Sequence, residues 1–163
     1  MTATTLLDVG RARLYAAEDM ALRLFDHGGT VQLAGAELTL PPEARFASVD
    51  SVDDYVRRVL AMPTVAQSWP RASVTVRVRP RRGHRKAHYE PDTHVIAVPD
   101  SPSGRWALRE LVVLHEIAHH LDDSSGAGHG PGFARTLIEL VGLVLGPEAG
   151  LVYRVIFADG GVA

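Results

Sequence analysis

The 163-residue chain contains no cysteine. This absence excludes disulfide bonds, thiolate catalysis and metal sites with cysteine ligands, so a bound zinc ion would have to be held by histidine and carboxylate side chains. Lysine is nearly absent too, because Lys86 is the only lysine and every other basic residue is arginine or histidine. Neither feature identifies a function, but the first restricts the possible chemistry to a small set of ligand types.

Long apolar runs are also missing. No segment approaches the ~20 consecutive apolar residues of a membrane span, and the first residues lack the pattern of a secretory signal. We therefore expect a cytoplasmic protein with no membrane partner. The formal net charge of −2 does not by itself favour nucleic acid as a partner. Because 46% of the residues are hydrophobic, the chain can bury one ordinary core, and we predict a single domain over residues 1–163.

Four segments have the apolar spacing of helices. They are residues 11–26, residues 51–62, residues 105–123 and the stretch from Pro131 to Gly146. Ser51 is the expected N-cap of the second segment, and Pro131 suits the first turn of the fourth. The third segment is apolar on nearly every side, which predicts a helix buried inside the domain. Residues 148–158 fit either a helix or a strand.

Three other segments alternate apolar and polar residues, as strands do. They are residues 30–40, residues 73–79 and residues 86–99. The first is expected to fold back at Gly35 as a hairpin, and the third to turn at residues 90–93. We therefore predict an α+β fold in which a small antiparallel sheet packs on the buried helix, with further helices at its flanks.

The predicted buried helix contains the sequence His115-Glu116-Ile117-Ala118-His119, an H-E-x-x-H motif. The four-residue spacing places both imidazoles on one helix face, where they can reach one metal ion. A catalytic zinc ion has three protein ligands and an open position for water, and Glu116 is placed to act as general base on that water. The alternative is a pair of hydrogen-bonded core histidines, but burying these three groups is costly unless they are paired or bound to metal.

Two residues are candidates for the third zinc ligand. Glu139 lies twenty residues past His119, a separation compatible with a zinc peptidase that has a glutamate ligand, but its helical position also suits an exposed ion pair. His129 precedes a predicted helix start and adjoins Gly130, where a backbone without a side chain can pack closely. We favour His129, which gives one Zn²⁺ per chain.

The pattern HEIAHH followed by HGPGF resembles the SprT-like (Spartan-like) zinc metallopeptidases, whose motif is H-E-x-x-H and, after a short loop, His-Gly-Pro-x-Phe. The resemblance implies a zincin fold, zinc held by His115, His119 and His129, Glu116 as catalytic base, and a peptide or protein substrate. Most of the chain, from LPPEARF to GPEA, is also similar to small predicted metallohydrolases of actinobacteria and their phages. That second resemblance implies a zinc hydrolase and nothing more specific.

Several other residues have two interpretations each. His120 is about 140° around the helix from His115, so it suits packing or a supporting hydrogen bond better than metal binding. Tyr89 and Tyr153 are candidates for lining a substrate cleft and for assisting an oxyanion, respectively, although ordinary packing explains both. Residues 77–86 hold six of the seventeen Lys and Arg residues. That stretch could contact nucleic-acid phosphates, or it is a solvated arginine-rich strand and turn.

Together these features predict a zinc-dependent hydrolase, with a metallopeptidase as the first interpretation. Two alternatives stay open at this point. One is a metal-stabilised module that binds nucleic acid or protein without turnover. The other is a zinc hydrolase that acts on a non-peptide bond, because the same activation of water serves any polarised carbonyl.

Overall fold

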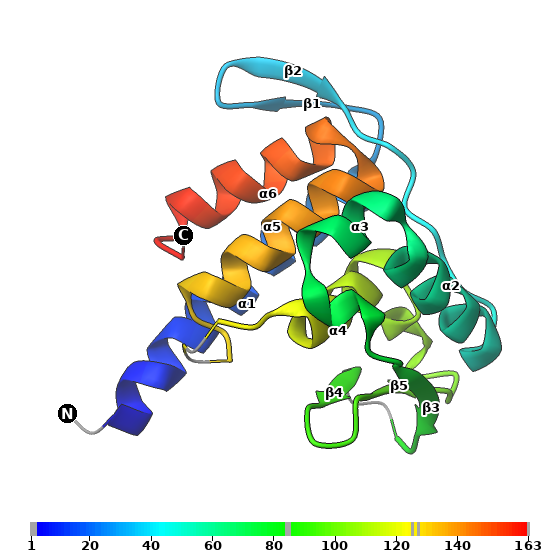
Figure 1. The fold of residues 1–163 in the computed structure, drawn as a ribbon. Helices are drawn as coiled ribbons and strands as arrows, with labels where there is room; N and C mark the ends of the chain where they lie inside the picture. The colour runs from blue at the N-terminus through cyan, green and yellow to red at the C-terminus, as the bar shows by residue number, and fades with distance from the viewer. Residues whose placement is uncertain (1–2, 84–85, 125, 127, 163) are drawn as a thin grey trace. The chain divides into compact units, whose positions relative to one another are not determined.

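The computed structural model describes residues 3–83, 86–124, 126 and 128–162 (Figure 1). The chain divides into two compact units, the first formed by Met1–Pro42 with Ser124–Ala163 and the second by Glu43–Asp123. Each unit combines helices with a small sheet, so the predicted α+β class is confirmed. The organisation as a single domain stays a prediction.

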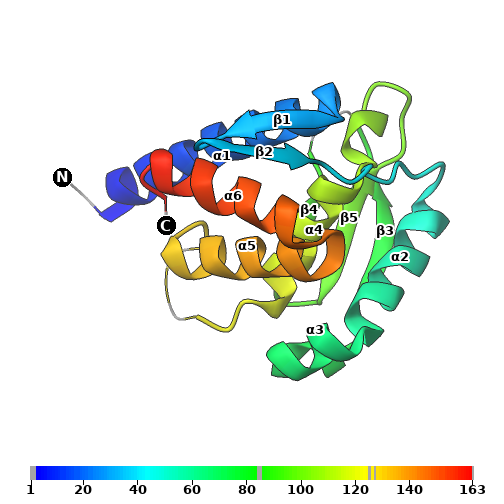
Figure 2. The same ribbon diagram turned by 90° about the horizontal axis from the view of Figure 1, so that it is seen from above.

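The first unit consists of three helices and a hairpin: α1 (Ala3–His27), β1 (Thr30–Leu33), β2 (Ala36–Thr39), α5 (Pro131–Leu145) and α6 (Pro147–Asp159). Helix α6 packs against both α5 and α1 (Figure 2). The segment for which helix and strand were equally compatible is therefore a helix. None of the helices in the described residues is both long and apolar enough to cross a membrane.

Two glycines allow α5 and α6 to approach closely. A Cβ atom added to Gly150 of α6 would lie 2.9 Å from the Cα atom of Gly142 in α5, which is closer than real Cβ contacts. Hydrogen is the only substituent that fits at position 150, so the two helix backbones are in direct contact there.

The hairpin forms where the sequence predicts it. Strands β1 and β2 pair antiparallel from Thr30 opposite Thr39 to Leu33 opposite Ala36. The two turn residues, Ala34 and Gly35, have φ angles of 50° and 78°. Positive φ at both central residues is characteristic of the tight turns that match the twist of paired strands.

The second unit surrounds the H-E-x-x-H helix. Its elements are α2 (Val49–Ala61), α3 (Pro63–Ser68), η1 (Pro70–Ser73), β3 (Arg77–Arg81), β4 (His88–Glu90), β5 (Val95–Pro99), η2 (Arg105–Ala107) and α4 (Glu110–Leu121). Helix α4 packs against β4, η1 and α2. Ten of its twelve residues are buried, which confirms the prediction of a buried helix. It begins at Glu110, later than expected, because residues 105–107 form a separate 3₁₀ turn and Arg109 has an extended backbone.

The three-stranded sheet of this unit has the order β3-β5-β4. Strand β5 pairs antiparallel with β4 but parallel with β3, so the prediction of an antiparallel sheet was wrong for one of the two pairings. All five residues of β5 are buried, which explains its central place between two more polar strands. The chain reverses direction twice between β3 and β5, and the two strands therefore run the same way.

Two predicted boundaries were also wrong. The N-cap of α2 is Ser48, whose hydroxyl accepts the Ser51 N–H at 3.1 Å, so Ser51 lies inside the first turn. Strand β3 begins at Arg77 because η1 ends at Ser73 and the following residues connect the two elements. Periodicity gives the type of an element more securely than its first residue.

Candidate metal centre

His115 and His119 lie one turn apart on α4, and their Nε2 atoms are 3.2 Å from each other. The ring centroids are 4.8 Å apart and the ring planes meet at 71°. His115 is buried and His119 is half-buried. The helix therefore brings the two imidazoles of the motif together with their distal nitrogens directed at a common point.

This geometry fits a shared zinc ion. Two ligand nitrogens at zinc-binding distance on a tetrahedral ion are separated by about 3.3 Å. The observed separation of the two Nε2 atoms, 3.2 Å, is close to that value. Imidazole is also the nitrogen ligand that zinc prefers, and the cysteine-free chain offers no competing thiolate. The pair could therefore supply two ligands without rearrangement of the helix.

Glu116 follows the first histidine in the middle of α4 and is only 6% exposed. A carboxylate in such an apolar helix is costly to desolvate, and its presence has to be compensated by pairing or by function. Buried carboxylates occur both at proton-transfer sites and in structural networks, and Glu110 of the same helix, also 6% exposed, belongs to the second kind. The placement of Glu116 is thus compatible with the role that the motif predicts for it.

His129 belongs to the first unit, where it precedes Gly130, the N-cap of α5. The Oη atom of Tyr15, on α1, lies 3.2 Å from His129 Nε2. The Phe133 ring packs edge-on against the imidazole, with centroids 5.5 Å apart. Tyr15 is in turn covered by the guanidinium of Arg11, 5.5 Å from its ring centre. Two aromatic neighbours and one hydrogen bond therefore fix the orientation of the His129 ring.

Tyr15 is a neighbour of the candidate ligand His129 that the sequence did not reveal. It precedes His129 by 114 positions, and it lies in a predicted helix whose apolar spacing accounts for it as an ordinary packing residue. No local motif connects the two positions, because their proximity arises from the packing of the first unit.

The alternative third ligand, Glu139, is exposed on α5. Its neighbours Ile138 and Leu140 are buried, so the carboxylate projects from the side of the helix that faces solvent. This position suits a surface carboxylate and does not favour Glu139 as a metal ligand.

His120 is fully buried and is held by hydrogen bonds within the second unit. Its Nε2 lies 3.0 Å from the carbonyl oxygen of Arg71 and 3.1 Å from that of Val74, while its Nδ1 lies 2.8 Å from Tyr89 Oη. The Arg71 side chain donates through Nε to the His120 carbonyl at 2.7 Å. His120 therefore connects the last turn of α4 to η1 and β4, as expected for a supporting residue.

The two carbonyl partners determine the tautomer of His120. Because carbonyl oxygens only accept, Nε2 carries the proton, and Nδ1 accepts the Tyr89 hydroxyl proton when the ring is neutral. Burial lowers the pKa of His120, which favours this neutral form. Burial likewise raises the pKa of Tyr89, although the neighbouring Arg71 opposes that shift. Tyr89 also contacts His94 Nδ1 at 3.1 Å and lies parallel to the His119 ring, with centroids 6.5 Å apart.

Two candidates from the sequence remain, Tyr153 and the basic stretch of residues 77–86. Tyr153 is buried in α6 beside Phe157. In the basic stretch, Arg79 forms an ion pair with Glu90 and lowers the pKa of that carboxyl, and Arg81 donates to the Lys86 carbonyl. Residues 84–85 of the stretch lie outside the described residues. Part of its positive charge is thus already engaged within the protein.

Comparison with known proteins gives no matching family model, no matching curated protein and no matching solved structure. The similarity to SprT-like metallopeptidases accordingly stays a prediction that depends on the two motifs.

Proposed function

We propose that this protein is a zinc-dependent hydrolase of peptide bonds, with zinc bound by His115, His119 and His129 and with Glu116 as general base. The observation that carries the proposal is the 3.2 Å separation of the two Nε2 atoms on a buried helix that also presents a buried carboxylate. Each of the three histidines can offer one ring nitrogen to an ion. A structural site would fill all four positions with protein ligands and would have no use for Glu116.

The chemistry follows from the donor set. A zinc ion held by three neutral imidazoles would lower the pKa of a coordinated water toward about 7 and polarise a substrate carbonyl. Glu116 accepts the proton of the attacking water at its carboxylate and later transfers it to the departing amine nitrogen. The buried surroundings of Glu116 raise the strength of these interactions, because few water molecules compete for the carboxylate.

An extended peptide is the substrate class that the second unit suits best. Strand β4 is an edge strand, pairs only with β5 in the described sheet, and packs against α4. Its Tyr89 ring lies parallel to the ring of His119. An exposed strand edge binds extended peptides through main-chain hydrogen bonds. A peptide added to β4 would therefore run beside the helix that carries the proposed zinc ligands.

The test is the metal content of the purified protein, measured by elemental analysis for the wild type, His129→Ala and Glu139→Ala. We expect one zinc per chain in the wild type and in Glu139→Ala, and its loss in His129→Ala. A zinc-loaded protein is then assayed against unfolded protein substrates.

Three results would contradict the proposal. A wild type that binds no zinc in zinc-replete medium would remove the hydrolase interpretation altogether. Retention of zinc in His129→Ala, with loss of zinc in Glu139→Ala, would identify Glu139 as the third ligand in place of His129. A wild type that binds zinc but hydrolyses none of the substrates, together with unchanged zinc binding in Glu116→Gln, would favour a metal-stabilised binding module without turnover.

A further inference from the structure

The N-terminal end of α4 needs hydrogen-bond partners from outside the helix. The first backbone N–H groups of any helix have no partner within it. The N-cap of α4 is Arg109, and its side chain makes no capping hydrogen bond. Because this end of α4 is buried, those N–H groups need partners from elsewhere in the protein.

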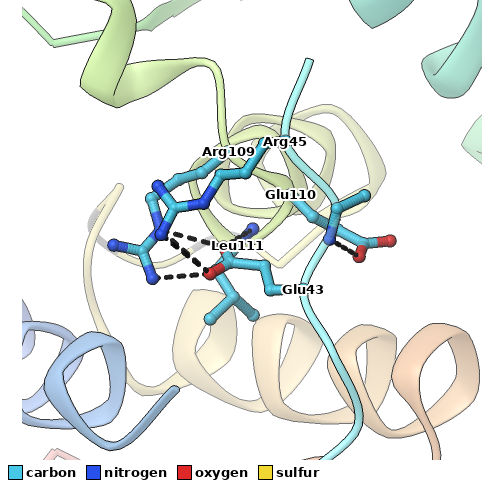
Figure 3. Close-up of polar contacts among 6 residues, drawn as sticks. Glu43, Arg45, Arg109, Glu110 and Leu111 are labelled. Carbon is cyan, nitrogen blue, oxygen red and sulfur yellow. Dashed lines mark hydrogen bonds and ion pairs between the residues drawn. The ribbon is translucent and has the colours of Figure 1, made fainter. Parts of the chain in front are cut away.

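Glu43 supplies one of these partners. Its carboxylate accepts the Leu111 N–H at 2.8 Å through Oε2 (Figure 3). The same carboxylate binds Arg109, whose Nε lies 2.9 Å and 3.1 Å from the two oxygens and whose Nη2 lies 2.5 Å from Oε1. Both side chains are almost inaccessible, with 4% exposure for Glu43 and 8% for Arg109. Glu43 therefore caps α4 from a position 68 residues away in the chain.

The residues that follow Glu43 hold the same helix end through their backbone. Ala44 accepts the Glu110 N–H at 2.9 Å through its carbonyl and donates its own N–H to Glu110 Oε1 at 3.0 Å. The other oxygen of Glu110 accepts the hydroxyl proton of Tyr55. The Phe46 N–H donates to the Leu108 carbonyl at 2.9 Å. Residues 43–46 thus form a short strap across the beginning of α4.

The hydrogen bond to Leu111 has a particular consequence for the two histidines. In an α-helix each N–H donates to the carbonyl four residues earlier. Leu111, His115 and His119 are spaced by four, so the Leu111 carbonyl accepts the His115 N–H and the His115 carbonyl accepts the His119 N–H, and these backbone hydrogen bonds link the three residues into one column. Glu43 accepts the N–H of Leu111, the first residue of this column, and its negative charge also interacts favourably with the positive end of the helix. A displacement at Leu111 would be transmitted along the column to both imidazoles.

We propose that Glu43 is a positioning residue for the metal site, because its carboxylate sets where α4 begins and thereby where the imidazoles of His115 and His119 lie. The inference deepens the proposed function and depends on it for the identity of the ligands. Glu43 itself touches neither ligand. Its effect would reach the two histidines through the backbone of Leu111 and the hydrogen bonds that join Leu111 to His115 and His115 to His119.

The test compares Glu43→Gln with two control variants. Glutamine keeps the size of the side chain and one acceptor oxygen but loses the charge that Arg109 requires. Glu90→Gln removes a half-buried carboxylate that also pairs with an arginine, Arg79, and controls for charge. Val59→Ala removes part of a buried side chain of α2 and controls for general destabilisation.

The readouts are the zinc dissociation constant from chelator competition, the visible spectrum of the cobalt-substituted protein, and amide hydrogen exchange of the metal-free protein. Circular dichroism fixes a temperature at which all four proteins are folded. We expect Glu43→Gln to weaken zinc binding about tenfold, as loss of an outer support typically does. We also expect an altered cobalt spectrum and faster exchange at Leu111. Both controls are expected to retain wild-type zinc binding and the wild-type spectrum.

Zinc affinity of Glu43→Gln within twofold of the wild type would overturn the proposal. Equal weakening in Val59→Ala would also overturn it, because the effect would then be one of stability alone. If the wild type binds no zinc, the proposed function fails, and hydrogen exchange still decides the role of Glu43. Faster exchange at Leu111 and His115 in Glu43→Gln, but not in Val59→Ala, would then support positioning of the helix, and unchanged exchange would exclude it.

Discussion

The Nε2 atoms of His115 and His119 face each other at 3.2 Å on one side of α4. At this distance the two rings can share one proton or bind one ion, and two protonated rings would repel each other. We expect His115→Ala and His119→Ala each to weaken zinc binding at least about a hundredfold, because each removes one of three ligands. Chelator competition measures the effect, and His27→Ala, which removes an exposed histidine at the end of α1, serves as the control. Wild-type affinity in either ligand variant would contradict the site.

Glu116→Gln separates catalysis from metal binding. The amide retains the shape of the side chain but cannot accept a proton, so turnover of an unfolded protein substrate should fall by about 10²–10⁴. Zinc content should stay at the wild-type level. Glu139→Gln removes an exposed carboxylate from α5 and should leave both quantities unchanged. Normal turnover in Glu116→Gln would show that another group acts as the base.

Tyr15→Phe tests the support of the third proposed ligand. The substitution removes only the hydroxyl that lies 3.2 Å from His129 Nε2 and keeps the ring that packs beside the imidazole. The prediction takes Nδ1 of His129 as the zinc ligand, because Nε2 contacts Tyr15. A metal-binding histidine is normally oriented by a partner on its second nitrogen, and loss of that partner weakens binding about 10- to 100-fold. We expect a zinc dissociation constant raised by roughly tenfold. An affinity equal to that of the wild type would show that Phe133 and packing suffice to orient the ring.

His120→Ala should destabilise the protein strongly. The variant removes the ring that donates to the carbonyl oxygens of Arg71 and Val74 and that accepts from Tyr89, and it leaves these groups buried without their partner. We expect a loss of about 3 kcal/mol in the free energy of unfolding. Urea denaturation measures it, with His88→Ala, at an exposed position of β4, expected to change stability by less than about 0.5 kcal/mol. A small effect of His120→Ala would mean that water replaces the ring.

Stability should fall in alkaline solution because of Tyr55. Burial and the nearby Glu110 carboxylate raise the pKa of its phenol well above the ordinary value. In the unfolded chain the phenol ionises at pH about 10, whereas in the folded protein it stays protonated. The unfolded state therefore loses the proton first, and the contribution of Tyr55 to stability, complete below pH 10, declines as the pH rises above it.

Denaturation at pH 8 to 11 measures this dependence. In Tyr55→Phe the decline above pH 10 should be smaller, because the variant has no phenol to ionise. An identical decline in the two proteins would assign the alkaline sensitivity to other groups.

Much of the local structure could be predicted from the sequence. Apolar periodicity gave the long helices, Ala34 and Gly35 fall in the predicted hairpin turn, and Pro131 begins α5. The H-E-x-x-H spacing also predicts that His115 and His119 share one helix face, which the structure confirms. These features depend on residues that are near one another in the chain.

The errors concern residues that are far apart in the chain. The parallel pairing of β3 with β5 is decided by which strand occupies the buried centre of the sheet, and alternation within one strand carries no information about that. Glu43 and Tyr15 were not recognised as supports for α4 and His129, because a buried carboxylate or a phenol has no sequence signal until its partner is known. Local patterns thus predicted the motif of the site and missed its supports.

The contact between Gly142 and Gly150 has a mechanical consequence for the candidate ligand His129. Side chains that separate two helices can change rotamer and so absorb small shifts, but here the backbones of α5 and α6 touch without an intervening side chain. The distance between the two helices at this point therefore cannot be adjusted by a change of side-chain rotamer. Because His129 lies just before α5, this contact limits the movement of the helix that follows it, and the orientation of the His129 ring depends on its own contacts with Tyr15 and Phe133.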